Sequence, residues 1–361
     1  MNVRPEIDRG ASRPAGRTKT INLALQGGGA HGAFTWGVLD AILDDGRIEV
    51  EGLSGTSAGA MNAAIFAYGK MIGGRDGAKE ALATFWREMS LAGEIFSPVR
   101  VLPWERALGP YTMNASLGYA VFDGLTRFLS PYEWNPLNIN PLRDLVGRHV
   151  DFETLQRCTE TKLFITATNV RDGKVRVFDT PETTLDVVMA SACLPFLYKA
   201  VEIDGEHYWD GGYMGNPSLF PFFYRCQSRD VLIVHINPME RDEVPMSAPD
   251  IMNRINEISF NSSLLRELRA IDFVAKLIDE GWLKDEYQDR LRKVLVHSIR
   301  ADEALADLSV ASKFDIGWGF LQDLRARGHA AGTAWIEAHF DDLGERGTVD
   351  LKAQYLADAR S

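Results

Sequence analysis

The chain has 361 residues, with 39 basic and 50 acidic side chains and a net charge of −11 at pH 7. Such an acidic chain is a poor binder of nucleic acid and gains no electrostatic attraction to an anionic membrane, so any transient membrane contact would depend on apolar insertion. The hydrophobic content of 45% and the charged content of 25% are typical of a globular protein with a large core.

Residues 1–20 predict a flexible arm and not a secretory signal peptide, because they are basic and contain no apolar h-region. No run approaches the roughly 20 apolar residues of a membrane span. The three cysteines lack metal-ligand spacing, which indicates reduced thiols. We therefore expect a cytoplasmic protein, at most peripheral at membranes, and the sequence leaves its oligomeric state open.

A glycine-rich loop follows the first strand-like run. Leu23 to Leu25 lead into Gly27-Gly28-Gly29, and an apolar helical pattern continues from Phe34 to Leu43. Backbone N–H groups of such a loop, at the opening of a helix, favour negative charge. That charge could be a bound phosphate or the oxyanion of a tetrahedral acyl intermediate.

The same loop matches the G-x-G-x-x-G pattern of dinucleotide-binding folds at Gly27, Gly29 and Gly32. Glu49 and Glu51 lie near the distance at which a ribose-binding acid is expected. Those acids precede the apolar Leu53, however, whereas a ribose-binding carboxylate should close its strand. The dinucleotide interpretation is therefore the weaker alternative.

A second strand-like run ends at the segment Gly55-Thr56-Ser57-Ala58-Gly59. A serine at a sharp strand-to-helix turn is exposed for attack, and the small residues beside it let a substrate carbonyl approach. Gly55 and Gly59 suit such a turn because it requires backbone angles that a Cβ resists. The pattern predicts a nucleophile that attacks acyl groups.

A strand-like hairpin further along ends in Asp210-Gly211-Gly212, which puts the aspartate at a strand end. Site residues of α/β folds collect at such ends. His235, near the end of a buried-strand pattern, would complete the chain order Ser…Asp…His used by α/β-hydrolases. A triad through His235 is thus an open alternative to a structural histidine in the core.

The glycine loop, the G-x-S-x-G turn and the D-G-G segment, in this order, resemble the patatin-like phospholipase family. The resemblance covers about Ile21 to Tyr224, and the segment from Ala190 to Pro195 is also similar to the family's small-residue helix that ends in proline. It implies a three-layer α/β/α fold with a mostly parallel central sheet, plus a C-terminal helical extension. It also implies lipid acyl hydrolysis by a Ser57–Asp210 dyad without a metal or cofactor, with oxyanion-hole N–H groups supplied by Gly27, Gly28 and Gly29.

One residue departs from the family pattern. The family usually carries Arg or Lys where this chain has His31, and an unperturbed histidine is mostly uncharged at pH 7. The departure leaves the dyad intact but gives weight to a plain carboxyl ester or a lysophospholipid as substrate. An intracellular polyester such as polyhydroxyalkanoate is an alternative substrate, and a non-catalytic lipid-binding protein of the same fold is the rival class.

The rest of the chain divides around this catalytic segment. We expect a catalytic domain over residues 21–224, and over residues 225–361 a last core strand with a mostly helical region packed on it. Residues 293–299 could form a late strand, and residues 319–340 predict a helix. Residues 95–141 form either a surface insertion or a lid over Ser57. This segment is rich in aromatic residues, namely Phe96, Trp104, Tyr111, Tyr119, Phe122, Phe128, Tyr132 and Trp134.

Overall fold

The computed structural model describes residues 18–96, 129–241, 244–287, 291–305, 308 and 310–356. The expected N-terminal arm and most of the aromatic segment between 95 and 141 lie outside the described residues, so the lid hypothesis stays untested. Among the helices of the described part, none is long and apolar enough to cross a bilayer.

One eight-stranded sheet forms the centre of the described chain, in the order β5-β6-β3-β2-β1-β7-β8, with β4 also paired to β3. The neighbours from β3 through β2, β1 and β7 to β8 run parallel, whereas β4, β5 and β6 pair antiparallel. The strands are β1 Lys19–Leu25, β2 Ile48–Gly55, β3 Lys162–Asn169, β4 Val175–Asp179, β5 Val201–Ile203, β6 Glu206–Asp210, β7 Asp230–His235 and β8 Leu295–Arg300.

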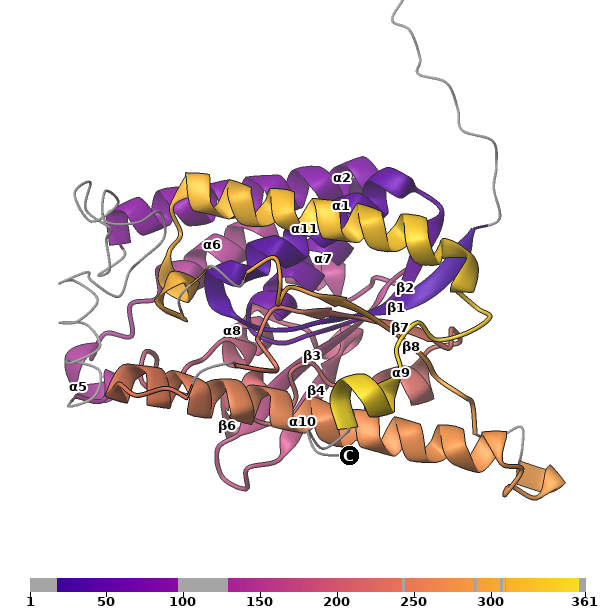
Figure 1. Cartoon of the computed structure of the whole chain (residues 1–361). Coiled ribbons are helices and arrows are strands. Elements are labelled where there is room, and N and C mark those ends of the chain that lie inside the picture. The colour runs from indigo at the N-terminus through magenta and orange to yellow at the C-terminus, as the bar shows by residue number, and fades with distance from the viewer. Residues whose placement is uncertain are drawn as a thin grey trace, which may run out of the picture.

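Helices cover both faces of this sheet (Figure 1), with α1, α2 and α11 on one face and α10 on the other. Helix α2 is broken at Gly73 and Gly74, whose backbone angles are not helical. The helices are α1 Gly32–Asp45, α2 Ala58–Phe96, α5 Pro131–Trp134, α6 Pro141–His149, α7 Phe152–Leu155, α8 Leu185–Ser191, α9 Phe220–Arg225, α10 Ala248–Asp279 and α11 Trp318–His339, with short 3-10 turns that include η1 Gly29–His31, η3 Gly211–Tyr213 and η5 Val310–Phe314.

Alternating side chains of the central strands build two cores. In β7, Leu232 and Val234 join the core under α1 and α2, whereas Val231 and Ile233 join the core against α10. A strand that is buried on both faces has apolar residues at successive positions. The sequence of β7 therefore shows no alternation of apolar and polar residues. The three-layer α/β/α fold and the mostly parallel sheet are confirmed, as are the C-terminal helices.

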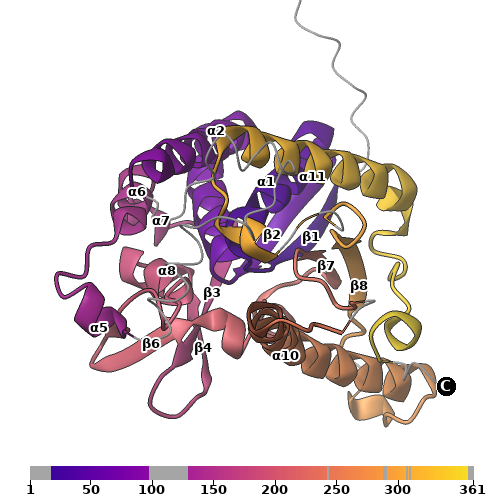
Figure 2. The same cartoon turned by 60° about the vertical axis from the view of Figure 1, so that its left-hand side comes forward.

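The C-terminal part of the chain is built into the same sheet. β7 pairs with β1, and β8 extends the sheet beyond β7, so the late strand expected over residues 293–299 exists. Helix α11 lies across α1 in both views (Figure 2). A Cβ on Gly328 would collide with the carbonyl oxygen of Phe34, so the two helices touch backbone to backbone. The sheet and both of its covering layers therefore draw on residues after 224.

Candidate active site

The strand-to-helix turn at Ser57 has the strained geometry that its sequence predicts. Ser57 lies between β2 and α2 with a φ of 55°, a left-handed conformation that is uncommon for a residue with a Cβ. A Cβ on Gly59 would collide with the carbonyl oxygen of Leu25, and one on Gly55 would collide with the backbone of Gly59. Both glycines are thus required by close backbone packing, and backbone strain of this kind is found at functional sites.

The glycine loop lies directly against this turn. β1 and β2 are adjacent, parallel and in register from Leu23 to Leu25, so the loops that follow them leave the sheet at the same edge. A Cβ on Gly27 would come 2.7 Å from the Cβ of Ser57. Where the helices α1 and α2 begin, a Cβ on Gly32 would come 2.8 Å from the Cβ of Ala58.

Asp210 reaches the same edge by a different path. Strand β3 pairs with β4 along one side, so its other side is shared by β2 as far as Ile165 and by β6 from Ala167 onward. Gly55 lies opposite Ile165, and Asp210 lies opposite Ala167. The end of β6 therefore continues the line of β2 and brings Asp210 to the Ser57 turn.

The carboxylate of Asp210 is half satisfied. Its Oδ1 accepts a hydrogen bond of 2.7 Å from the N–H of Gly212, whereas Oδ2 has no hydrogen-bond partner among the described residues. The Ser57 hydroxyl approaches the carboxylate closely enough to lower its pKa, although no fully aligned hydrogen bond is formed.

Burial sets the acidity of Asp210. The side chain is 1% exposed, and this loss of hydration raises its pKa to about 7, against the lowering effects of the Gly212 N–H and the Ser57 hydroxyl. A carboxyl group with a pKa near 7 can both accept and release a proton at neutral pH. Asp210 can therefore change its charge close to neutral pH.

Two neutral side chains join the three motifs to one another. Asn216 accepts the N–H of Gly27 through Oδ1 at 2.7 Å, and Thr56 donates its hydroxyl to the carbonyl of Gly215 at 2.6 Å. Sequence reasoning missed Asn216, because no local pattern links it to a loop that lies almost 190 residues earlier. The N–H of Gly27 is therefore already used, whereas those of Gly28 and Gly29 have no acceptor in the described part of the chain.

Ser191 fixes the serine turn from the other side. Its hydroxyl accepts the backbone N–H of Ser57 at 3.0 Å, from the end of α8. Ser191 is the last residue of α8 and lies in the small-residue segment from Ala190 to Pro195. The helix ends at Ser191, so the rest of that segment is not helical, although the resemblance predicts a helix there. The contact helps to hold Ser57 in its left-handed conformation.

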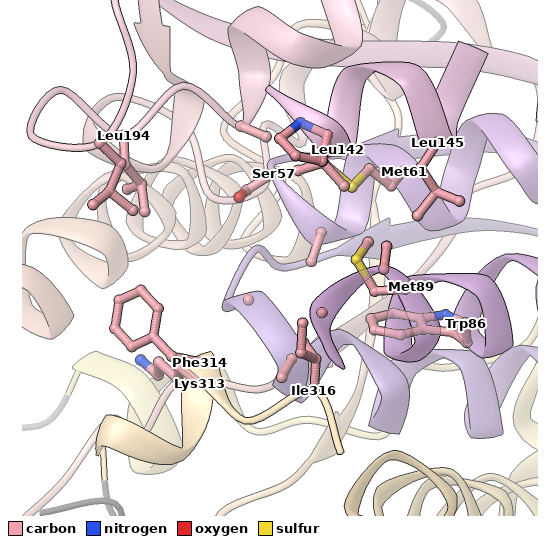
Figure 3. A pocket seen from close by; sticks show the side chains of 18 of the residues that line it. Ser57, Met61, Trp86, Met89, Leu142, Leu145, Leu194, Lys313, Phe314 and Ile316 are labelled. Atoms are coloured by element: carbon pink, nitrogen blue, oxygen red, sulfur yellow. The ribbon is translucent and has the colours of Figure 1, made fainter. Parts of the chain in front are cut away.

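An apolar cavity of about 290 Å³ opens beside Ser57. Figure 3 shows the Ser57 oxygen at its wall, with Met61 and Leu145 on one side and Leu194 on another. Of the described residues that line the cavity, Lys313 is the one with a charged side chain. Other parts of the wall come from Trp86, Met89, Leu142, Phe314 and Ile316. A fatty acyl chain matches such a lining.

His31 lies next to the glycine loop as a neutral side chain. It is 5% exposed, and its Nε2 makes a hydrogen bond of 2.7 Å with the hydroxyl of Ser312. Burial, and then the nearby charges of Lys313 and Arg241, lower its pKa to about 3. His31 therefore supplies no positive charge to the site at neutral pH.

His235 belongs to a different cluster. It follows Val234 in β7, so its side chain faces α10, on the opposite side of the sheet from the core under α1 and α2. Its Nε2 contacts the hydroxyl of Tyr355 at 2.9 Å, and that hydroxyl also donates to Ser298 at 2.9 Å. The geometry gives no support to a triad through His235.

The dinucleotide interpretation also fails on geometry. Glu49 binds Lys70 and Arg75, and Glu51 accepts the N–H groups of Gln227 and Ser228. Both glutamates lie in the first half of β2, whereas the glycine loop follows the last residue of β1. They are therefore separated from that loop along the strand and already paired.

Three comparisons relate this chain to known proteins. A search of curated proteins found no match. Among solved structures, the chain is similar to VipD from Legionella pneumophila (14% identity, TM-score 0.43, covering 99% of this chain and 78% of that one). It is also similar to a chain of the ExoU–SpcU complex from Pseudomonas aeruginosa (18% identity, TM-score 0.30, covering 90% of this chain and 76% of that one). The family model for patatin-like phospholipases matches residues 23–223, and the chain therefore belongs to the patatin-like phospholipase family, a family of lipid acyl hydrolases.

Proposed function

We propose that the chain hydrolyses fatty acyl esters, as a phospholipase A, lysophospholipase or carboxylesterase, through an acyl-serine intermediate formed by a Ser57–Asp210 dyad. The observation that carries this proposal is the buried Asp210, whose Oδ2 is unpartnered among the described residues while the Ser57 hydroxyl lies beside it at the wall of an apolar cavity. The catalytic unit corresponds to residues 21–224, completed by the strands and helices of residues 225–361.

In the first half-reaction, Asp210 accepts the proton of the Ser57 hydroxyl while the oxygen attacks the ester carbonyl. The negative charge that develops on the carbonyl oxygen is stabilised by backbone N–H groups. Gly28 and Gly29 are the donors of the predicted oxyanion hole that have no other acceptor in the described chain, whereas Gly27 donates to Asn216. Ala58, as the residue after the nucleophile, adds an N–H at the start of α2.

Collapse of the intermediate breaks the bond to the alcohol, which leaves with the proton that Asp210 held. In the second half-reaction, Asp210 takes a proton from water, the hydroxide attacks the acyl-Ser57 ester, and the fatty acid leaves as Ser57 regains its proton. The apolar cavity holds the acyl chain during both steps, and the lost contact with water favours longer chains by about 0.8 kcal/mol for each buried CH₂ group.

The test is hydrolysis of p-nitrophenyl esters of increasing chain length by the wild type and by Ser57→Ala, together with labelling by a fluorophosphonate. We expect turnover to fall by roughly 1000-fold or more in Ser57→Ala, because the nucleophile is removed, and the label to be found on Ser57 alone. A folded wild type that neither turns over an ester nor takes the label would favour the lipid-binding alternative. Turnover of polyhydroxyalkanoate in preference to every lipid ester would favour the polyester alternative.

A further inference from the structure

The cavity beside Ser57 contains a cation that the dyad does not use. Lys313 lies in η5, more than 250 residues after the serine in the sequence, and its backbone packs against the glycine loop. A Cβ on Gly29 would come 2.5 Å from the carbonyl oxygen of Lys313. In Figure 3 the side chains of Lys313 and Phe314 lie close together, on the side of the cavity toward which the Ser57 oxygen points.

The ammonium group of Lys313 is held in place but not neutralised. Its Nζ donates to Oδ1 of Asn237 at 2.9 Å, and the amide of Asn237 in turn donates to the carbonyl of Gly27 at 2.6 Å. Lys313 forms no ion pair with any residue in the described part of the chain. The two hydrogen bonds therefore fix a positive charge beside the loop that carries the oxyanion donors.

Lys313 has no carboxylate of its own among the described residues. Glu257, the carboxylate that acts on it, is 2% exposed and is already bound by Arg241 at 2.6 Å and by Arg254 at 3.1 Å. Asp302 and Asp250 act on Arg241, and Asp302 is also paired with Arg300. A bound anion would give Lys313 the ionic partner that it lacks among the described residues.

Lys313 is largely charged at neutral pH. Burial lowers its pKa to about 8, with Glu257 opposing this shift and Arg241 adding to it. The neighbouring His31 is neutral, so among the described residues that line the cavity Lys313 supplies the positive charge next to the glycine loop. The charge is thus present under the conditions in which Asp210 works as a base.

We propose that Lys313, positioned by Asn237, binds the phosphate of the lipid ester and so makes this chain prefer phosphate-bearing esters over neutral ones. This inference rests on the proposed function. The phosphate of a glycerophospholipid lies a few bonds from the scissile ester, on the alcohol side, and so outside the apolar cavity that takes the acyl chain. Lys313 is the charged residue among the described lining residues and lies beside Gly29, on the side toward which the Ser57 oxygen points, so it can meet this phosphate.

The test compares two substrates with the same acyl chain, lysophosphatidylglycerol and monoacylglycerol, both below the concentration at which they form micelles. We expect Lys313→Met to lower kcat/KM for the lysophospholipid by about 10- to 100-fold and to leave that for the monoacylglycerol within about twofold, because one charged contact is lost. Lys313→Arg should restore much of the preference. An equal loss on both substrates, or no loss on either, would overturn the proposal.

Lys199→Met is the matched control. Lys199 is also partly buried and donates its Nζ to a neutral oxygen, the carbonyl of Pro136 at 2.8 Å, but it does not line the cavity. We expect this variant to keep the wild-type ratio of the two substrates. A fall in the ratio as large as that of Lys313→Met would show that any loss of lysine charge has this effect, and would overturn the assignment to Lys313.

A binding measurement separates this inference from the proposed function. Ser57→Ala, titrated with lysophosphatidylglycerol, should bind about tenfold or more tightly than Ser57→Ala with Lys313→Met, and both should bind monoacylglycerol equally. This result would uphold the phosphate site even if the wild type hydrolysed neither lipid. Equal binding of the lysophospholipid by both variants would refute it. If inorganic phosphate displaces the lysophospholipid at similar concentrations, the ligand is the free ion and the headgroup assignment is wrong.

Discussion

Asp210 and His235 are both buried ionisable side chains at the ends of strands in one sheet, yet the chain puts them to different uses. Asp210 keeps one oxygen unpartnered among the described residues, next to a hydroxyl and an apolar cavity. His235 also has one ring nitrogen, Nδ1, without a partner among the described residues, but its Nε2 contacts Tyr355 on the α10 side of the sheet, and it does not line the cavity. Burial moves the pKa of Asp210 up to about 7 and that of His235 down to about 3. The same physical cause thus gives one group that changes charge near pH 7 and one that does not.

Substitution of Asp210 and of His235 should show the largest difference between the two residues. Asp210→Asn should lower kcat/KM on a p-nitrophenyl ester by about 1000-fold or more, because the amide cannot take the proton of Ser57. His235→Gln should leave kcat/KM within about threefold, since the side chain lies on the other face of the sheet. Steady-state kinetics on both folded variants measure this, and a comparable loss in His235→Gln would return the triad to consideration.

The pH dependence of hydrolysis should also distinguish Asp210 from His235. A general base acts when it is deprotonated, so kcat/KM should fall about tenfold for each pH unit below the Asp210 pKa of about 7. Above that value the rate should be constant, because no further proton is lost from Asp210. The measurement is a pH profile from 5 to 9 on a neutral ester. If kcat/KM of His235→Gln begins to fall at a different pH from that of the wild type, the assignment of this pKa to Asp210 would be contradicted.

Stability should respond to pH in opposite directions at the two residues. The folded-state pKa of Asp210 is raised from 3.8 to about 7, so its contribution to stability is full below pH 4 and is lost as the pH rises through 7. The folded-state pKa of His235 is lowered from 6.5 to about 3, so its contribution is full above pH 6.5 and is lost as the pH falls.

Unfolding in urea at three pH values tests these signs. Relative to the wild type, Asp210→Asn should gain about 2–4 kcal/mol in free energy of unfolding between pH 4 and pH 8. His235→Gln should gain about 2 kcal/mol relative to the wild type between pH 8 and pH 5, since the unfolded wild type alone takes up the proton there. A difference of the same sign for both variants on raising the pH would show that one pKa shift is misassigned.

Local patterns predicted the backbone well. The helix expected over residues 319–340 is α11, Trp318–His339, and the extended run after Lys293 is β8. These elements follow from hydrophobic periodicity, which depends on neighbours within a few residues. The turn at Ser57 was equally visible, because only glycine fits the close backbone contacts on either side of it.

Contacts between distant segments could not be predicted in this way. Asn216 takes the N–H of Gly27, which leaves Gly28 and Gly29 as the free donors of the predicted set in the described chain, and no motif announces that pairing. Lys313 lines the cavity although it lies outside residues 23–223, which match the family model. The sequence around it is typical of an ordinary surface turn. His235 was a reasonable triad candidate until the alternation of β7 put it on the other face.

The sequence by itself determined the three motifs, the order of the strands and helices that carry them, and so the candidate nucleophile and base. It could do so because a sharp turn, an apolar strand and a D-G-G end are properties of short stretches of chain. The tertiary structure decided the hydrogen-bond partner of each polar group, the burial of Asp210, and the position of Lys313 beside the glycine loop. These depend on strand register and on packing between segments hundreds of residues apart, where a shift of one residue moves a side chain to the other face of the sheet.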